Sequence, residues 1–244
     1  MAKFLRIAHA GAGIYAPPNT LRSFELGLQF GVDMIEFDVR RCRDGLVLIH
    51  DKDLRASTSW RGNVRDYTLA ELRRVDAGDG APIPTLYEAV SLIKGRAQMN
   101  VDLKEAGYEG EVLEVLRRHG VLGDVLVSSS NPTSLRAVKT LTPEVAVGLS
   151  YPSNKSYMVP VVRLTLWLTR LTVPRYILRL IADAHADATM LRHQIITPQL
   201  VIVVHHAGYR IFAWTVDDLV VMRRLKKMGI DGITSNRPDL LAQL

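Results

Sequence analysis

Residues 5–39 read LRIAHAGAGIYAPPNTLRSFELGLQFGVDMIEFDV, and this stretch predicts a strand, a helix and a second strand in succession. Leu5 to Ala10 is apolar at strand length, Thr20 to Phe30 has the helical period, and Met34 to Arg40 has the β-branched and apolar content of a buried strand. We expect Asn19 to cap the helix. A strand, a helix and a strand in this order form the βαβ unit of a parallel sheet.

The same alternation continues along the rest of the chain. Further strand candidates are Leu46 to His50, Ala97 to Lys104, Asp124 to Ser130, Val145 to Tyr151, Ala188 to Leu191, Arg210 to Val216 and Gly232 to Ser235. Helix candidates begin at Thr85, at Asn131 with Pro132, and at Asp217. With the segment that ends at His50 counted as an extension beside the second strand, eight βα units remain.

These units predict an α/β fold, a (β/α)₈ barrel formed as one domain by residues 1–244. The alternative is an open, doubly wound sheet. No G-x-G-x-x-G turn opens a helix after a strand in this sequence, so the dinucleotide-binding version of that fold has no support.

The composition is that of an ordinary globular protein, with 48% hydrophobic and 23% charged residues. A net charge of +6 suits an anionic substrate, a membrane surface or nucleic acid. The excess charge is scattered and no nucleic-acid motif stands out, so we expect no nucleic-acid partner. Cys42 is the only cysteine, which excludes an intramolecular disulfide. The first residues, MAKFLRIAHA, have too short an apolar run for a signal peptide, and we expect a cytoplasmic protein. The composition leaves the oligomeric state open.

Two stretches interrupt the alternation of strands and helices. Asp51 to Pro84 is rich in Arg, Asp and Gly, and we expect it to form a side lobe near the mouth of the barrel. Ser153 to Ala182 carries five Lys or Arg residues and no acidic residue, among aromatic residues, Leu, Val and Ile. We interpret the second stretch as a helical lid or packing insertion. The alternatives are a peripheral membrane contact and an oligomer contact.

Acidic residues gather on two of the predicted strands. Glu36 and Asp38 are two residues apart, so they lie on the same face, about 6.6 Å apart along the strand. The segment MNVDLKE places Asp102 and Lys104 on one face in the same way. At a barrel mouth these three carboxylates would repel one another without a cation, and Mg²⁺ and Ca²⁺ prefer oxygen ligands. We predict one divalent metal ion, Mg²⁺ or Ca²⁺, held by the three carboxylates.

Two histidines end the strands beside this acidic set. His9 ends the first strand and His50 ends the extension beside the second. Histidine changes charge near neutral pH, so the pair would supply a general acid and a general base on either side of the metal. Each residue alone has a structural interpretation, as a hydrogen-bonded histidine or an ion pair. Their joint convergence at one barrel mouth favours the catalytic interpretation, whereas we interpret the other five histidines as structural or solvated.

The stretch HAGAGIYAPPNTLRSFELGLQFGVDMIEFDVRRCRDGLVLIHDKDL resembles the glycerophosphodiester phosphodiesterase signature, in which HR-G, a PENT-like turn, ExDV, DG and HD follow in this order. The resemblance continues through IPTLYEAV, NVDLK, WTVDD and GITSNRPDLL, and covers nearly the whole chain except residues 153–182. It implies a (β/α)₈ barrel that hydrolyses glycerophosphodiesters to an alcohol and glycerol 3-phosphate with a divalent metal.

The resemblance also implies roles for the residues that match its motifs. His9 and His50 match the acid and base pair of the family. Glu36 and Asp38 match its ExD metal ligands, and Asp102 falls where the family usually has a glutamate ligand.

The substrate contacts match less completely. Lys104 matches the lysine near the phosphate, and Trp214 matches an aromatic residue that lines the substrate pocket. Ala10 replaces an arginine that contacts phosphate in the family, and Pro18 replaces the glutamate of the PENT-like turn. A lost charge-assisted hydrogen bond costs roughly 1.5–3 kcal/mol, or about one to two decades in rate. Arg40 lies on the same strand face as the acidic pair, and we expect it to substitute in part for the missing cation.

We therefore predict a metal-dependent phosphodiesterase that acts on glycerophosphodiesters by acid and base catalysis through two histidines. One alternative is a lysophospholipase D-like enzyme on lipid substrates, which the basic and aromatic segment 153–182 suggests. The other is a degenerate barrel that binds a phosphorylated ligand without turning it over, which Ala10 and Pro18 suggest. Carboxylate ligands suit Mg²⁺ and Ca²⁺ alike.

Overall fold

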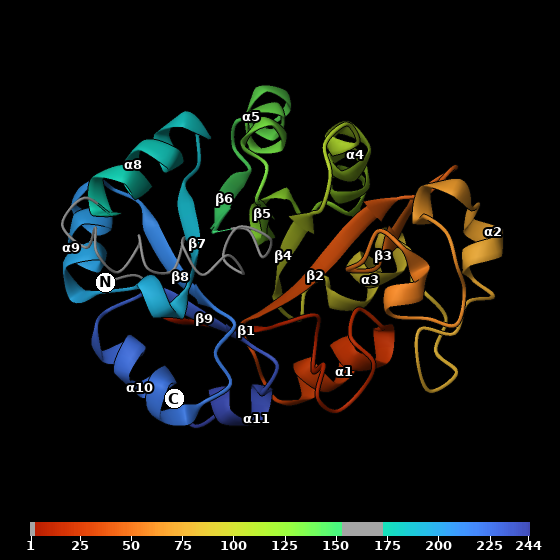
Figure 1. Ribbon diagram of the computed structural model, residues 1–244, viewed down its shortest axis with the longest axis horizontal. Helices are drawn as coiled ribbons and strands as arrows, with labels where there is room; N and C mark the ends of the chain where they lie inside the picture. The colour runs from red at the N-terminus through yellow and green to blue at the C-terminus, as the bar shows by residue number, and fades with distance from the viewer. Residues whose placement is uncertain (1–2, 153–172) are drawn as a thin grey trace.

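The computed structural model describes residues 3–152 and 173–244, and in this part of the chain eight parallel strands close into a barrel (Figure 1). The strands are β1 (Leu5–Ala8), β2 (Met34–Arg41), β4 (Gln98–Leu103), β5 (Val125–Ser129), β6 (Ala146–Tyr151), β7 (Ala188–Arg192), β8 (Arg210–Trp214) and β9 (Gly232–Ser235). Strand β1 pairs with both β2 and β9, which closes the ring. The predicted (β/α)₈ barrel is confirmed.

The mainly apolar sequence of these strands matches their burial on both faces of the sheet. All residues of β2 from Met34 to Val39 are buried, as expected for a parallel strand covered on both faces. The short strand β3 (Leu46–Leu48) pairs antiparallel with β2, through Val39 and Leu48 among others. The predicted extension beside the second strand is therefore present outside the ring.

Helices surround the barrel in Figure 1. They are α1 (Leu21–Gln29), α3 (Leu86–Ile93), α4 (Glu109–His119), α5 (Pro132–Leu141), α8 (Val173–Asp183), α9 (Pro198–His206), α10 (Leu219–Lys227) and α11 (Pro238–Leu241). Single turns of 3₁₀ helix lie at Leu122–Asp124 and His193–Ile195. Thr85 and Asn131 cap α3 and α5, as predicted, because their side chains accept backbone N–H groups of the first turn.

Two predicted helix caps are wrong by one residue. Thr20, not Asn19, caps α1, and its side chain accepts the backbone N–H of Ser23. Asp218, not Asp217, caps α10. The local capping rule did not distinguish two adjacent residues that are both good caps. In both cases the displaced residue hydrogen-bonds within the candidate active site.

Residues 51–84 form the predicted side lobe, at the right of Figure 1. The lobe contains the short helix α2 (Leu69–Leu72) and two turns of 3₁₀ helix, Leu54–Ala56 and Val64–Asp66. It has its own hydrophobic cluster, built on Cys42, Val47, Ile49, Leu54, Val64, Leu72, Val75 and Ile83. This cluster joins the lobe to β3 and so fixes it beside the end of β2.

Most of the predicted insertion at 153–182 cannot be placed, because residues 153–172 lie outside the described residues. The lid, membrane-contact and oligomer-contact interpretations fall on that segment. The described remainder belongs to α8, which packs Val173, Ile177 and Ile181 into the main hydrophobic core. Within residues 3–152 and 173–244, no helix combines the length and the apolar character needed to cross a membrane.

Three aspartates connect neighbouring strands at the amino-terminal end of the barrel. Asp33, Asp187 and Asp231 each precede a strand and accept the backbone N–H of the strand beside it, at 3.0, 2.8 and 2.7 Å. Each also pairs with a basic side chain. The cations are Lys3 and Arg6 for Asp33, Lys139 for Asp187 and His205 for Asp231. These carboxylates are therefore structural links between strands.

Candidate active site

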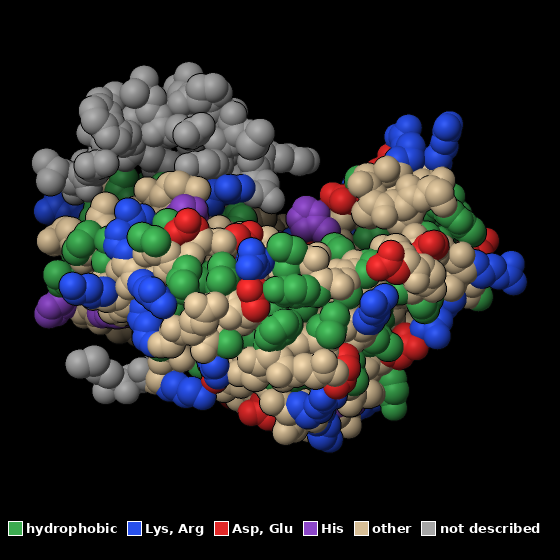
Figure 2. Space-filling model, turned by 90° about the horizontal axis from the view of Figure 1, so that it is seen from below, with side chains coloured by type: hydrophobic (Ala, Val, Ile, Leu, Met, Phe, Trp, Pro, Cys, Tyr) green, Lys and Arg blue, Asp and Glu red, His purple; other side chains and the backbone are tan. Residues whose placement is uncertain are grey.

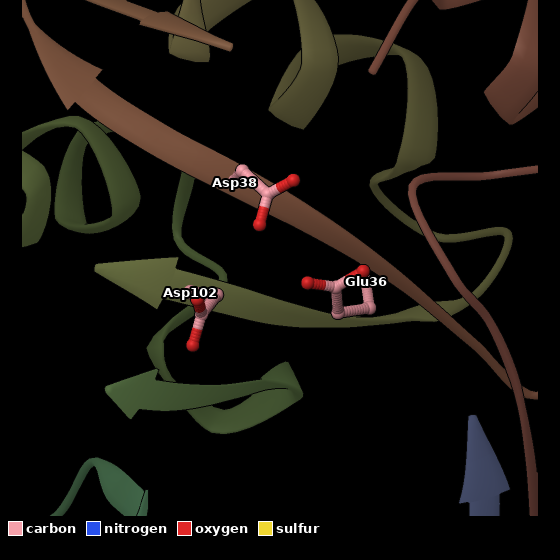
Figure 3. A group of neighbouring side chains, drawn as sticks. All are labelled: Glu36, Asp38 and Asp102. Carbon is pink, nitrogen blue, oxygen red and sulfur yellow. The ribbon is translucent and has the colours of Figure 1, made fainter. Parts of the chain in front are cut away.

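The three predicted acidic ligands converge at the carboxyl-terminal end of the barrel. Glu36 and Asp38 project from β2, and Asp102 projects from the adjacent strand β4 (Figure 3). Asp38 and Asp102 are directly paired residues of the two strands. One oxygen from each carboxylate lies within 4.8 Å of the others. Oxygens bound to one Ca²⁺ or Mg²⁺ are at most about 4–5 Å apart, so this spacing suits a shared ion.

The charges of this acidic set are unbalanced. The side chains of Glu36 and Asp38 are only 7% and 2% exposed. The ammonium group of Lys104 lies between two of the carboxylates, 2.6 Å from Asp38 and 2.7 Å from Asp102. Burial raises the pKa of Asp38, but the charge of Lys104 outweighs it and holds that pKa at about 2. For Glu36, burial and the charge of Asp38 raise the pKa to about 7. One lysine thus leaves surplus negative charge, which a divalent cation would neutralise.

A further oxygen donor, which the sequence prediction missed, lies beside this set. Asn100 is paired with Glu36 across the two strands and is buried. In the described part of the chain its side-chain oxygen has no hydrogen-bond partner. An amide oxygen is a hard ligand of the kind that Ca²⁺ and Mg²⁺ accept. The donor set therefore fits a divalent cation, and the spacing of two from Asp102 was the signal that would have identified Asn100.

His9 is oriented by residues from the other end of the sequence. Its Nδ1 lies 2.7 Å from the side-chain oxygen of Asn236, whose side-chain nitrogen donates to Asp217 at 2.7 Å. Because an amide oxygen only accepts, Nδ1 carries the proton in neutral His9 and Nε2 remains available toward Glu36, 3.9 Å away. Burial lowers the pKa of His9, but the charges of Glu36 and Asp38 outweigh it and raise that pKa above its ordinary value.

His50 is held by its own neighbours. Its Nδ1 lies 3.0 Å from a carboxylate oxygen of Asp51. Its backbone carbonyl accepts two hydrogen bonds from the Arg40 guanidinium, at 2.9 and 2.7 Å. The same guanidinium donates to Glu105 at 3.0 Å. Arg40 therefore fixes the position of His50, while its predicted contact with substrate stays a prediction.

The loop after β1 also supports the carboxylates. Ala10 has a left-handed backbone, with φ of 48°, and its N–H donates to Glu36 at 2.8 Å. Gly11 follows with φ of 84°, and a Cβ there would lie 2.3 Å from the Ser23 hydroxyl oxygen. Only glycine fits that turn. Asn19 exchanges two hydrogen bonds with Asp38, at 2.7 and 3.0 Å, and so fixes its carboxylate.

Two pockets meet at the histidines. Of the eight predicted site residues, seven line a first pocket of about 770 Å³, namely His9, Glu36, Arg40, His50, Asp102, Lys104 and Trp214. Asp38 lines the adjoining second pocket. Figure 2 shows a hollow at the upper edge of the molecule, with histidine exposed at its floor beside the lobe. The structure thus brings all eight predicted residues together. None of the other five histidines lines either pocket.

Aromatic and basic residues also line the first pocket. Trp214, at the end of β8, donates its indole N–H to the carbonyl of Met190 at 2.8 Å. The Arg192 guanidinium lies 4.8 Å from the centre of the Trp214 ring. Lys52 also lines this pocket. The sequence prediction missed Arg192 and Lys52, because single basic residues at a strand end or in a lobe carry no spacing pattern.

Known proteins are similar to this chain in both sequence and fold. The sequence model of the Glycerophosphoryl diester phosphodiesterase family matches residues 9–240. A glycerophosphodiester phosphodiesterase of Caldanaerobacter subterraneus subsp. tengcongensis is 33% identical over 256 residues, which cover 99% of this chain and 98% of that protein.

Solved structures extend this similarity to the fold. The crystal structure of a glycerophosphodiester phosphodiesterase from Agrobacterium tumefaciens superposes with a TM-score of 0.81 at 28% identity, and covers 100% of both chains. A phosphodiesterase of Oleispira antarctica in complex with the product sn-glycerol-3-phosphate has a TM-score of 0.81 at 28% identity, and the match covers 98% of this chain and 96% of that one. The chain therefore belongs to the glycerophosphoryl diester phosphodiesterase family.

Proposed function

We propose that this protein hydrolyses glycerophosphodiesters to an alcohol and sn-glycerol 3-phosphate, with one divalent cation, Mg²⁺ or Ca²⁺, bound by Glu36, Asp38 and Asp102. The observation that carries the proposal is the convergence of three carboxylates and two oriented histidines on one pocket, in a chain of this family. The Oleispira antarctica relative, in complex with sn-glycerol-3-phosphate, supports the choice of product.

Each part of the pocket has a role in this proposal. When bound, the cation would offset the negative charge that develops on the phosphoryl oxygens. One imidazole, acting as general base, takes a proton from water that attacks phosphorus directly, or from a neighbouring glycerol hydroxyl, in which case water must then open the resulting cyclic phosphate to give glycerol 3-phosphate. The other, acting as general acid, gives a proton to the leaving alkoxide. Both His9 and His50 have Nδ1 hydrogen-bonded to a neighbouring side chain, so Nε2 is the nitrogen that exchanges protons.

The remaining predicted residues bind the substrate. Burial lowers the pKa of Lys104, but the charges of Asp102 and Asp38 outweigh it and raise that pKa, so Lys104 stays positively charged beside the phosphate. Trp214 forms an apolar wall for the glycerol carbons. Arg40 faces the same pocket while it holds the His50 backbone, so it acts on the substrate and on the position of the histidine together.

Release of glycerol 3-phosphate from glycerophosphocholine tests the proposal. Protein dialysed against a chelator should be inactive, and Mg²⁺ or Ca²⁺ should restore product formation. The His9→Ala, His50→Ala double variant should lose at least about 10²-fold in kcat/KM, because general acid and base catalysis contribute roughly 10²–10⁴-fold. His206→Ala, an exposed histidine outside both pockets, is the matched control and should behave as wild type.

Three outcomes would contradict parts of the proposal. Metal-dependent product that survives in the double variant would refute the histidine mechanism. Tight binding of glycerol 3-phosphate without turnover of any diester would favour the degenerate barrel. Turnover of lysophospholipids, without turnover of glycerophosphocholine, would favour a lysophospholipase D-like enzyme and a membrane-peripheral location through residues 153–182.

A further inference from the structure

The second pocket adjoins the first at the histidine pair. It has a volume of about 340 Å³, and His9 and His50 line both pockets. Its walls come from the loop after β1, from the end of β3 and from the side lobe. Any molecule cleaved between the two imidazoles can therefore place one part in each pocket.

The two pockets differ in charge. The first is lined by four basic residues, Arg40, Lys52, Lys104 and Arg192. Among the described residues that line the second pocket, none is Lys or Arg. A phosphate diester keeps a negative charge at neutral pH, so its phosphoryl group is attracted to the first pocket.

Most of the surface of the second pocket is apolar, although polar residues also line it. Six of its lining residues are aliphatic or proline, namely Ala10, Pro18, Leu48, Ile49, Ala77 and Ile83. Ala10 and Pro18 are the positions where the family signature has an arginine and a glutamate, so this chain has small apolar side chains at both positions. Ser57 and Thr58 of the lobe add hydroxyl groups, and the carboxylates of Asp38 and Asp51 add negative charge.

We propose that the second pocket binds the leaving alcohol of the diester, a compact alcohol that is neutral or cationic, while the glycerol and phosphoryl groups occupy the first. This assignment rests on the proposed function. In the reaction the bond from phosphorus to the alcohol oxygen breaks, and a bond from phosphorus to the attacking oxygen forms. One imidazole takes the proton of the attacking group, and the other gives a proton to the alkoxide. That alkoxide must lie within reach of an imidazole, which the second pocket provides.

The chemistry of the walls sets the alcohol class. The apolar lining favours carbon atoms over water, and the volume limits the size of the group. The carboxylate of Asp51 and the lack of lining basic residues disfavour an anionic alcohol. Choline and ethanolamine fit this description, and inositol, a bulkier neutral alcohol, serves with them as a probe of size.

Variants that fill the second pocket with a larger side chain test its assignment to the leaving alcohol. Ser57 is exposed on the lobe and lines only the second pocket, so Ser57→Phe places a ring there without replacing a carboxylate or a histidine. Ser59→Phe is the matched control, because Ser59 is exposed two residues away and lines neither pocket. Ala77→Leu fills the same pocket from another loop and serves if Ser57→Phe fails to fold.

The measurements are kcat/KM for glycerophosphoinositol, glycerophosphocholine and glycerophosphoethanolamine, and the inhibition constant of glycerol 3-phosphate. Ser57→Phe should lower kcat/KM for the inositol ester about tenfold or more and for the ethanolamine ester less than about threefold, because a filled pocket discriminates by size. The inhibition constant should change less than about twofold, because that product lies in the first pocket. Ser59→Phe should match wild type throughout.

Equal losses for all three diesters, or a profile identical to wild type in both filled variants, would overturn the assignment. A large rise in the inhibition constant of glycerol 3-phosphate would overturn it too, because the product would then share the filled pocket. If wild-type protein with metal released no glycerol 3-phosphate from any diester, the proposed function itself would fail, and this outcome is visible before any variant is made.

Discussion

The two ends of the barrel use acidic residues in opposite ways. At the amino-terminal end, Asp33 accepts hydrogen bonds from a neighbouring backbone N–H and from Arg6, and contacts Lys3. Burial raises the pKa of Asp33, but these donors outweigh it and lower the pKa to about 2. At the mouth, burial and the negative charge of Asp38 raise the pKa of Glu36 to about 7.

The difference separates Asp33, whose charge is matched by donors within the chain, from Glu36 of the proposed metal site, whose charge is not. A carboxylate that stabilises the fold is matched by donors within the chain, so its charged form is favoured. The mouth contains three carboxylates around one lysine, and this surplus of buried negative charge lowers the stability of the fold. Such a loss of stability is expected where an external cation completes a site, because the ligands that bind the cation repel one another in its absence.

The largest expected difference concerns the lysines at the two ends. Without divalent metal, Lys104→Met should lower the free energy of unfolding by about 3 kcal/mol, because Asp38 and Asp102 lose the cation between them. Lys139→Met is the matched control: Lys139 pairs with Asp187 at the other end, and both lysines are 19% exposed. It should cost less than about 1 kcal/mol, because Asp187 is 44% exposed.

Urea unfolding with chelator and then with Mg²⁺ or Ca²⁺ measures both variants. The cation should restore most of the stability lost in Lys104→Met, and should give Lys139→Met no more than it gives wild type. Equal losses in the two variants, or no rescue of Lys104→Met, would remove the distinction between the two ends.

A smaller effect is expected at Asp33. Asp33→Asn should lower the free energy of unfolding by about 1–2 kcal/mol at pH 7, after allowance for solvent screening. Because the folded pKa is depressed, the contribution is fully present above the unfolded pKa of about 4 and is lost as pH falls through about 2. Urea unfolding at pH 7 and at pH 2 should therefore show a difference from wild type that is much smaller in acid. A difference of equal size at both pH values would contradict the ionic origin.

Much of the site followed from the spacing of residues on strands. Side chains alternate between faces, so Glu36 with Asp38, and Asp102 with Lys104, had to share a face at the carboxyl ends of parallel strands. The apolar runs fixed the strands themselves, since a parallel strand buried on both faces is apolar along most of its length. Asn100 obeys the same spacing rule. It was missed because a neutral amide on a strand, unlike a carboxylate, does not by itself predict a cation site.

Other features depend on contacts that no local pattern encodes. Asn236 reaches His9 because β9 closes the ring beside β1, a contact across 227 positions. Asn19 supports Asp38 through a left-handed backbone, with φ of 60°, that only the folded loop imposes. The second pocket exists because the side lobe packs near the loop after β1. The sequence predicted the lobe, but not its contact with that loop.

Calorimetric titration of the chelator-treated protein with Mg²⁺ and with Ca²⁺ at pH 8 tests most directly whether the surplus charge at the mouth binds a cation. Wild type and Asp33→Asn should each bind one ion per chain with the same affinity. Glu36→Gln should bind it at least about tenfold more weakly, because it removes the charge of one ligand. Unchanged affinity in Glu36→Gln, or equal weakening in Asp33→Asn, would contradict a metal site at the mouth of the barrel.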